Sequence, residues 1–205
     1  YDKDAPFWGF TSWNDFFTRQ LAPDVRPIDE PDTNKKSIVS ACDCKTFKLS
    51  VNVQKEDKFW LKDQPYSLNQ MLAADEHVDQ FVGGDVFQAF LCAFNYHRWH
   101  SPVSGTIVKA YVKQGTYYSE AESQQTPETG GIDVGGPDKS QGYITHVATR
   151  AIILIEADDP KIGLMAVMPV GMAEISSCII DPEIQPGKPV RKGQELGFFQ
   201  FGGST

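Results

Sequence analysis

Hydrophobic residues recur at helical spacing in two stretches of the chain. Residues 11–23 (TSWNDFFTRQLAP) can begin a helix at a capping hydroxyl, Thr11 or Ser12, and the helix must end by Pro23. Residues 67–78 (SLNQMLAADEHV) can begin at Ser67 in the same way. The positions that would face the core are Trp13, Phe16, Phe17 and Leu21 in the first helix, and Leu68, Met71 and Leu72 in the second.

The remaining hydrophobic pattern is typical of short strands separated by polar breaks. The first runs are SIVSA, TFKLSVNV and FWLK, between residues 37 and 62. Residues 86–112 indicate a strand, a histidine-bearing segment at a strand edge, a Pro-Val-Ser-Gly turn and another strand. Further strands fall within residues 146–158, 162–180 and 189–201, with turns at 158–160 and 192–193.

One long stretch does not fit this pattern. Residues 118–142 are rich in Gly, Pro, Ser, Thr and Gln and in acidic residues, so we expect a long loop there. The whole pattern predicts an α+β fold: mainly an antiparallel β sheet or partly closed barrel with a few peripheral helices.

Composition narrows the class of partner. With 205 residues, of which 40% are hydrophobic, the chain can bury a core as a single domain, and its longest apolar runs have only the length of strands. The formal net charge of -8 disfavours nucleic acid and docking on an anionic membrane surface, and favours a small-molecule partner. No leader peptide precedes Tyr1 in this piece, which we interpret as a fragment.

Cysteine usage bears on the cell compartment. The four cysteines are sparse, and Cys42 and Cys44 do not have the Cys-x-x-Cys spacing of zinc or redox sites. We expect reduced thiols in a cytoplasmic protein.

The segment YHRWHSP carries two histidines three residues apart, His97 and His100. On a helix such a pair could hold one zinc ion, but no third or fourth ligand accompanies it, so no metal is expected. Two histidines with satisfied ring nitrogens are the ordinary alternative.

The end of the chain offers a nucleophile. Gly202 and Gly203 precede Ser204, and two residues without Cβ atoms leave the Gly203 carbonyl open to a neighbouring hydroxyl. A serine nucleophile requires a base and an orienting carboxylate, for which one of the histidines and Asp43 are candidates. A flexible glycine-serine end remains the alternative.

Three ordered motifs resemble those of the phosphatidylserine decarboxylase family. They are SWNDFFTRQLAPDVRPI near the start, FNYHRWHSPVSGTI in the middle and KGQELGFFQFGGST at the end. Finer similarity, in APFWGF, IEADDPKIGL and GMAEIS, is to the soluble fungal branch of the family that decarboxylates tryptophan. The family's usual Ala-Asp-Gly reads Cys42-Asp43-Cys44 in this chain.

The resemblance implies a self-processing enzyme with a pyruvoyl cofactor. It implies that Ser204 attacks the Gly203 carbonyl, that the resulting ester eliminates, and that the pyruvoyl group replaces Ser204. It assigns His100 as the base for this cleavage, Asp43 as the carboxylate that orients His100, and His97 as the acid of decarboxylation. Residues 1–205 would then be one catalytic domain. They would comprise a large chain up to Gly203 and the start of a short pyruvoyl-bearing chain, which remains its partner after cleavage.

The resemblance also suggests a substrate. We expect an aromatic L-amino acid, with tryptophan first, converted to its amine and carbon dioxide; phosphatidylserine is the alternative substrate. Candidate pocket walls are Trp8, Phe10, Trp99 and residues 118–142. A homodimer is the oligomer considered. His97, His100 and Ser204 together argue against a non-catalytic scaffold, and the absence of a modifiable lysine at a hairpin tip argues against a lipoyl-like hairpin at residues 189–199.

Overall fold

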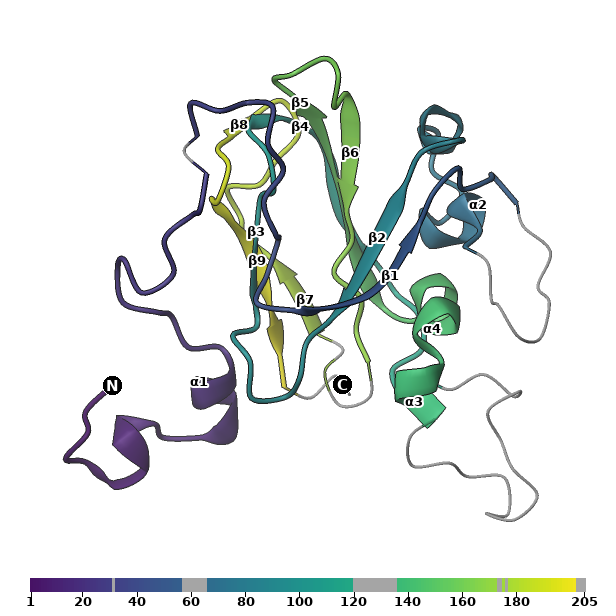
Figure 1. The fold of residues 1–205 in the computed structure, drawn as a ribbon. Coiled ribbons are helices and arrows are strands. Elements are labelled where there is room, and N and C mark those ends of the chain that lie inside the picture. Colours follow the sequence, from purple (N-terminus) through teal and green to yellow (C-terminus); the bar gives the residue numbers. More distant parts are fainter. Residues whose placement is uncertain (31, 57–65, 120–135, 173–174, 176, 202–205) are drawn as a thin grey trace, which may run out of the picture.

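The computed structural model describes residues 1–30, 32–56, 66–119, 136–172, 175 and 177–201. Its strands form three antiparallel sheets (Figure 1). A two-stranded ribbon pairs β1 (Lys45–Ser50) with β2 (Val86–Phe90). A three-stranded sheet has the order β3 (Arg98–His100), β9 (Glu195–Gln200), β7 (Ser177–Ile180). A four-stranded sheet has the order β6 (Leu164–Val167), β5 (Arg150–Ala157), β4 (Gly105–Lys113), β8 (Pro189–Val190).

The helices are short and lie at the periphery. They are η1 (Pro6–Gly9), α1 (Trp13–Phe17), α2 (Leu68–Met71), η2 (Val78–Phe81), α3 (Gly136–Lys139) and α4 (Gln141–Val147). Figure 1 shows α1 beside the β3–β9–β7 sheet, and α2 and α4 on the opposite side of the molecule. The α+β fold class is therefore confirmed, but the ladders among the described strands remain three separate sheets and do not close into a barrel. No helix in these described ranges is both long and apolar enough to cross a bilayer.

The central strand β5 has a hydrophobic core on each face. Successive side chains of a strand point to opposite faces, so Ala151, Ile153 and Ile155 join one core while Ile152 and Leu154 join the other. The first core lies against the β3–β9–β7 sheet, and the second lies against α2 and η2. The near-continuous apolar run of β5 is thus explained by burial on both faces.

The helix at the start of the chain begins where the pattern predicts and ends sooner. Ser12 caps α1 by accepting a hydrogen bond from the Asp15 amide at 3.0 Å. Side chains then cap the carbonyls at the end of α1. Thr18 Oγ1 donates to the Asn14 carbonyl at 2.9 Å, and the Arg19 guanidinium donates to the Phe16 carbonyl at 3.0 Å. Leu21 therefore lies outside the helix, and of the aromatic stripe only Phe17 is fully buried.

Two further predictions from the pattern are corrected. The end of the stretch expected as a loop is helical, in α3 and the start of α4, and residues 120–135 of it lie outside the described residues. The run SIVSA is not a strand, although the Val39 amide donates to the Pro102 carbonyl at 3.1 Å. FWLK also lies outside the described ranges. The second helix starts after Ser67 and buries Leu68, Met71 and Leu72 as predicted. It ends already at Met71, short of the predicted Val78, and the Ser67 side chain makes no capping hydrogen bond.

Candidate active site

His97 lies at the entrance to β3 and is 1% exposed. Its imidazole is stacked on the Phe17 ring with centroids 3.8 Å apart and planes inclined by 22°. Neither ring nitrogen has a hydrogen-bond partner among the described residues. Burial lowers the pKa of His97 to about 4; the Asn95 backbone acts in the opposite direction and the Arg19 charge in the same one. His97 is therefore a neutral imidazole near pH 7.

The end of β9 approaches the same place. The Phe201 ring contacts Phe17 at a centroid distance of 6.0 Å, and the Phe201 amide donates to the Asn14 side chain of α1 at 3.1 Å. Phe17 thus contacts both His97 and Phe201. Gly203 and Ser204 lie outside the described residues, but Ser204 is three residues beyond Phe201, so even a fully extended chain separates their Cα atoms by no more than about 11 Å.

His100 lies on β3, an edge strand of its sheet, and has different neighbours. Its amide donates to the Ala41 carbonyl at 2.7 Å, and its ring is stacked on Tyr96 at 5.8 Å between centroids. Burial lowers the pKa of His100, the carboxylates of Glu195 and Asp43 oppose that effect, and Arg98 adds to it. The two histidines therefore lie in different environments, one dry and aromatic and the other close to charges.

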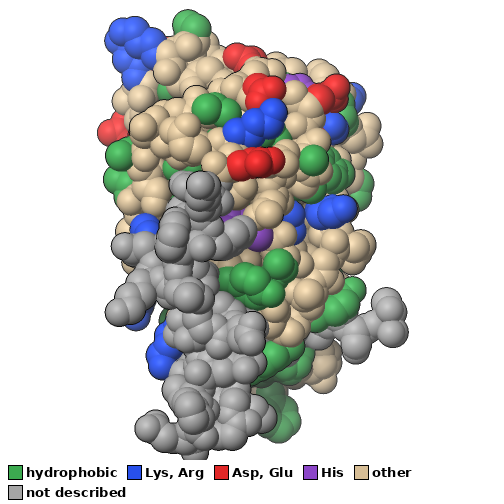
Figure 2. Space-filling view, turned by 90° about the vertical axis from the view of Figure 1, so that its right-hand side faces the viewer, with side chains coloured by type: hydrophobic (Ala, Val, Ile, Leu, Met, Phe, Trp, Pro, Cys, Tyr) green, Lys and Arg blue, Asp and Glu red, His purple; other side chains and the backbone are tan. Residues whose placement is uncertain are grey.

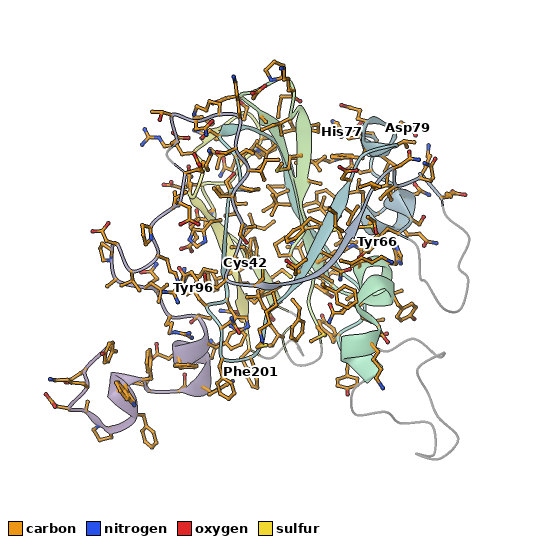
Figure 3. All side chains as sticks on the ribbon, viewed as in Figure 1. Cys42, Tyr66, His77, Asp79, Tyr96 and Phe201 are labelled. Atoms are coloured by element: carbon orange, nitrogen blue, oxygen red, sulfur yellow. The ribbon has the colours of Figure 1, made fainter. Side chains whose placement is uncertain are left out.

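Asp43 lies close enough to act on the pKa of His100 but is not hydrogen-bonded to it. Its carboxylate accepts from Arg26 Nε at 2.9 Å, and its backbone carbonyl accepts from the Asn95 side chain at 3.1 Å. Cys44 stands where the resembling family has glycine, and it is not among the residues with positive φ, so this turn does not require glycine. Figure 3 labels Cys42 and Tyr96, both in the region beside the β3–β9–β7 sheet.

The Cys42-Asp43-Cys44 segment has a property that its spacing did not reveal. The interaction with the Cys42 thiol lowers the pKa of Cys44 to about 6, and the interaction with Cys44, together with burial, raises the pKa of Cys42. The Ser40 hydroxyl lies 3.5 Å from the Cys44 sulfur. All four cysteines are within the described residues and none forms a disulfide.

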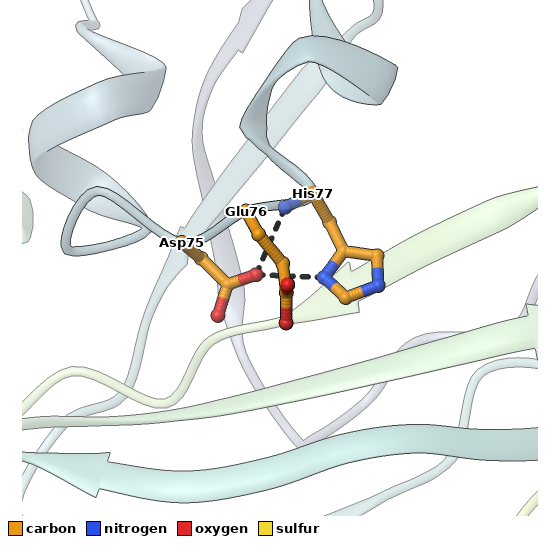
Figure 4. Close-up of side chains that lie close together, drawn as sticks. All are labelled: Asp75, Glu76 and His77. Atoms are coloured by element: carbon orange, nitrogen blue, oxygen red, sulfur yellow. Dashed lines mark hydrogen bonds and ion pairs between the residues drawn. The ribbon is translucent and has the colours of Figure 1, made fainter.

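The zinc arrangement considered for His97 and His100 requires a helix, whereas the pair lies at a strand. The described His, Cys, Asp and Glu residues come close enough to share an ion at Asp75, Glu76 and His77 (Figure 4). There Lys109 Nζ lies 2.7 Å from Asp75 Oδ2, and His77 Nδ1 lies 2.7 Å from Asp75 Oδ1. Burial alone would raise the pKa of Asp75, but these contacts hold it well below its usual range. A lysine ammonium already supplies the positive charge that this cluster needs.

Figure 2 shows the face around α2, where acidic and basic side chains alternate near the top and hydrophobic side chains gather below. The exposed hydrophobic residues of the β1–β2 ribbon are Phe47, Leu49 and Phe87. Trp99, considered above as a pocket wall, is 2% exposed and packs on Phe199 in the core. Trp8 is 59% exposed and contacts Tyr1, whereas the Phe10 ring packs edge-on against Phe16.

Comparison with known proteins identifies the family. The family model described as phosphatidylserine decarboxylase matches residues 13–205, and the chain belongs to that family. Among its relatives, the "Decarboxylase iboD" of Amanita muscaria is 42% identical over 210 residues, covering 100% of this chain and 59% of that protein. The L-tryptophan decarboxylase of Psilocybe cubensis is 40% identical over 210 residues, covering 100% and 47%. The phosphatidylserine decarboxylase proenzyme 3 of Schizosaccharomyces pombe is 30% identical over 204 residues, covering 100% and 19%.

The coverage values also show how much of each relative this chain spans. The chain spans 47–59% of the length of the first two relatives. Both of these relatives are named decarboxylases, and the third relative is named a proenzyme. The family predicted from the three motifs is thereby confirmed, while the roles of Ser204, His100, His97 and Asp43 stay predictions.

Proposed function

We propose that residues 1–205 form one catalytic domain of a self-processing, pyruvoyl-dependent decarboxylase, cleaved between Gly203 and Ser204. The observation that carries this proposal is the contact of Phe17 with both His97 and Phe201. It supports a site in which the end of β9 delivers Ser204 to the neighbourhood of the two histidines. The proenzyme names of several relatives support a cleaved chain.

The surroundings of His97 fit a pyruvoyl group. A buried imidazole is costly when neither nitrogen has a partner, as holds for His97 within the described part of the chain, and a small carbonyl-bearing group at this point would supply one. The pyruvoyl group formed from Ser204 would provide the electron sink for loss of carbon dioxide. His97, neutral at rest, would first take up a proton at a ring nitrogen and then pass it to the substrate carbon, with the ring held in orientation by Phe17.

His100 is the better candidate for the base of self-cleavage. It lies near two carboxylates, whose charges favour the imidazolium that a base becomes. Asp43 is our candidate for the carboxylate that orients it. The Ser204 hydroxyl would lose its proton to His100, and its oxygen would attack the Gly203 carbonyl.

The substrate that we propose is a free aromatic L-amino acid, with tryptophan first. The name of the Psilocybe relative supports this choice, and aromatic side chains around α1 offer an apolar wall beside Phe201. Trp13 lies 6.0 Å from both the Phe201 and the Phe94 ring, edge-on in each case. Phosphatidylserine is the second candidate, supported by the family and by the yeast relative. A homodimer and a cytoplasmic location remain part of the proposal.

The cleavage is tested with Ser204→Ala in the full-length protein. Alanine has no oxygen with which to attack, so we expect one uncleaved chain and no activity, whereas Ser50→Ala at the end of β1 should cleave normally. Gel mobility and intact mass report the result, with a ketone on the smaller fragment of the cleaved protein. Two chains from Ser204→Ala, cut at the same bond, would show that another protease makes the cut.

The substrate is tested with the cleaved protein. Tryptophan, phenylalanine, tyrosine and detergent-dispersed phosphatidylserine are supplied in turn, and carbon dioxide and amine are measured. We expect tryptamine from tryptophan as the main product. Phosphatidylethanolamine without tryptamine would overturn the proposed substrate and leave the proposed cleavage intact.

A further inference from the structure

The β3–β9 ladder places Glu195 directly opposite His100. Residues opposite one another in an antiparallel pair have Cβ atoms about 4.5 to 5.5 Å apart, so their side chains interact across the ladder. The register is irregular between Trp99 and His100, a feature that turns a side chain relative to a regular strand.

Arg98 holds the Glu195 carboxylate in place. Arg98 Nη1 lies 2.5 Å from Glu195 Oε1. The guanidinium is itself fixed, because Nη2 donates to the Thr18 carbonyl at 2.6 Å and its carbon lies 4.7 Å from the centre of the Phe198 ring. None of the described residues bonds the second oxygen, Oε2, of Glu195, which therefore keeps an acceptor free.

Two carboxylates act on His100, and they are held differently. Glu195 opposes the effect of burial on the pKa of His100 more strongly than Asp43 does. Asp43 is bonded to Arg26, whose side chain is 61% exposed, whereas the Arg98 that holds Glu195 is 11% exposed. The other charged or titratable groups facing His100 are Arg98 and Tyr96.

We propose that Glu195 is a positioning residue for self-cleavage: its carboxylate, fixed by Arg98, faces His100 and stabilises the imidazolium formed there. This proposal rests on the proposed function, which makes His100 the base. The proton of the Ser204 hydroxyl passes to a ring nitrogen of His100, and the Ser204 oxygen forms a bond to the Gly203 carbonyl carbon. The carbon–nitrogen bond then breaks, and His100 returns the proton to the departing nitrogen.

The test uses histidine titration by NMR in the full-length protein carrying Ser204→Ala, which keeps the chain uncut. Adding Glu195→Gln should lower the titration midpoint of His100 by about one pH unit. The matched control, Glu183→Gln, removes one exposed carboxylate on the turn after β7 and should leave the midpoint unchanged. Equal midpoints in the two variants would overturn the proposal. This readout requires no cleavage, so it is independent of whether the chain processes itself.

A second measurement tests the proposal without the Glu195→Gln substitution, in case that variant does not fold. In the Ser204→Ala protein with Glu195 intact, the side-chain carboxyl signal of Glu195 should change at the His100 midpoint, and a Glu195 signal that is flat there would contradict the proposal. With Ser204 restored, Glu195→Gln should slow cleavage at least about tenfold. It should also move the acidic limb of the profile of cleavage rate against pH to lower pH. Uniformly slower cleavage with an unmoved limb would indicate a structural role alone.

Discussion

The Phe17 ring lies almost flat against the His97 imidazole, 3.8 Å away between centroids. Phe17 is the buried residue of α1, a helix of five residues whose other aromatic side chains are partly exposed. A short helix at the edge of the molecule thus supplies one of the side chains that cover His97. The low pKa of His97 follows from its burial, with the Arg19 charge acting in the same direction.

We predict different defects for the two histidines. His100→Ala should block cleavage, because the base is lost, and His97→Ala should permit cleavage but depress turnover at least about 100-fold. Gel mobility measures the first effect, and amine release from the cleaved protein measures the second. Exchanged phenotypes would show that the roles of His97 and His100 are the reverse of those proposed.

Asp43→Asn should slow cleavage without abolishing it. The amide keeps the size of the side chain but supports an imidazolium less well, and Glu195 remains beside His100. Arg26→Gln is the matched change on the other side of the 2.9 Å ion pair and should leave cleavage close to normal. The cleavage rates of the Asp43→Asn and Arg26→Gln variants are compared on gels. An unaffected Asp43→Asn variant would show that Asp43 has no part in the mechanism.

Acid should destabilise the protein through its buried histidines. Burial lowers the pKa of His146 to about 4, with the Arg150 charge acting in the same direction, so the unfolded chain binds a proton first as the pH falls. The free energy of unfolding should therefore decrease below about pH 6.5, by about 1.4 kcal/mol per pH unit for each such histidine until about pH 4. His97 contributes in the same window.

His146→Gln tests this dependence. The Ser67 amide donates to His146 Nε2 at 3.1 Å, and a glutamine oxygen can accept in its place without titrating. Urea unfolding between pH 7.5 and pH 4.5 should give a shallower decline for the variant than for the unsubstituted protein. Identical declines would exclude His146 as a source of acid sensitivity.

Arg150 should be important for stability. This guanidinium is 2% exposed and donates to the carbonyls of Met71, Gln70 and Ala148 at 2.7–2.8 Å, which ties the end of α2 to the start of β5. Arg150→Met removes the donor from the Met71 and Ala148 carbonyls, while the Gln70 carbonyl still accepts from the Ala73 amide at 3.1 Å. The change should reduce the free energy of unfolding by about 3 kcal/mol or more. Arg191→Met, at an exposed position, should cost less than about 0.5 kcal/mol in the same denaturant titration.

Much of the local structure could be predicted from the sequence. The start of α1 at Ser12 and the buried face of Leu68, Met71 and Leu72 follow from capping and periodicity, which act over a few residues. The end of α1 could not be predicted in this way, because the Arg19 side chain caps the helix although the apolar pattern continues to Leu21.

The site was predicted less completely, for a different reason. His97, His100 and Asp43 were recognised through motifs, but the contacts of Phe17 and Glu195 with the histidines depend on packing and strand register. Phe17 and Glu195 both lie in the matching motifs, but the motifs do not show that these two residues lie next to His97 and His100. A contact over 80 or more residues requires the fold itself.

Among the described strands, the β1–β2 ribbon forms no ladder with either larger sheet, whereas β5 is paired on both edges. In deuterium exchange, the amides of β1 should therefore become labelled long before those of β5. Asp43 lies two residues before β1, at the base of this ribbon. A brief opening of the ribbon would move Asp43 relative to His100 while β3 and β9 stay paired, so the two carboxylates near one histidine would differ in how often they are in place.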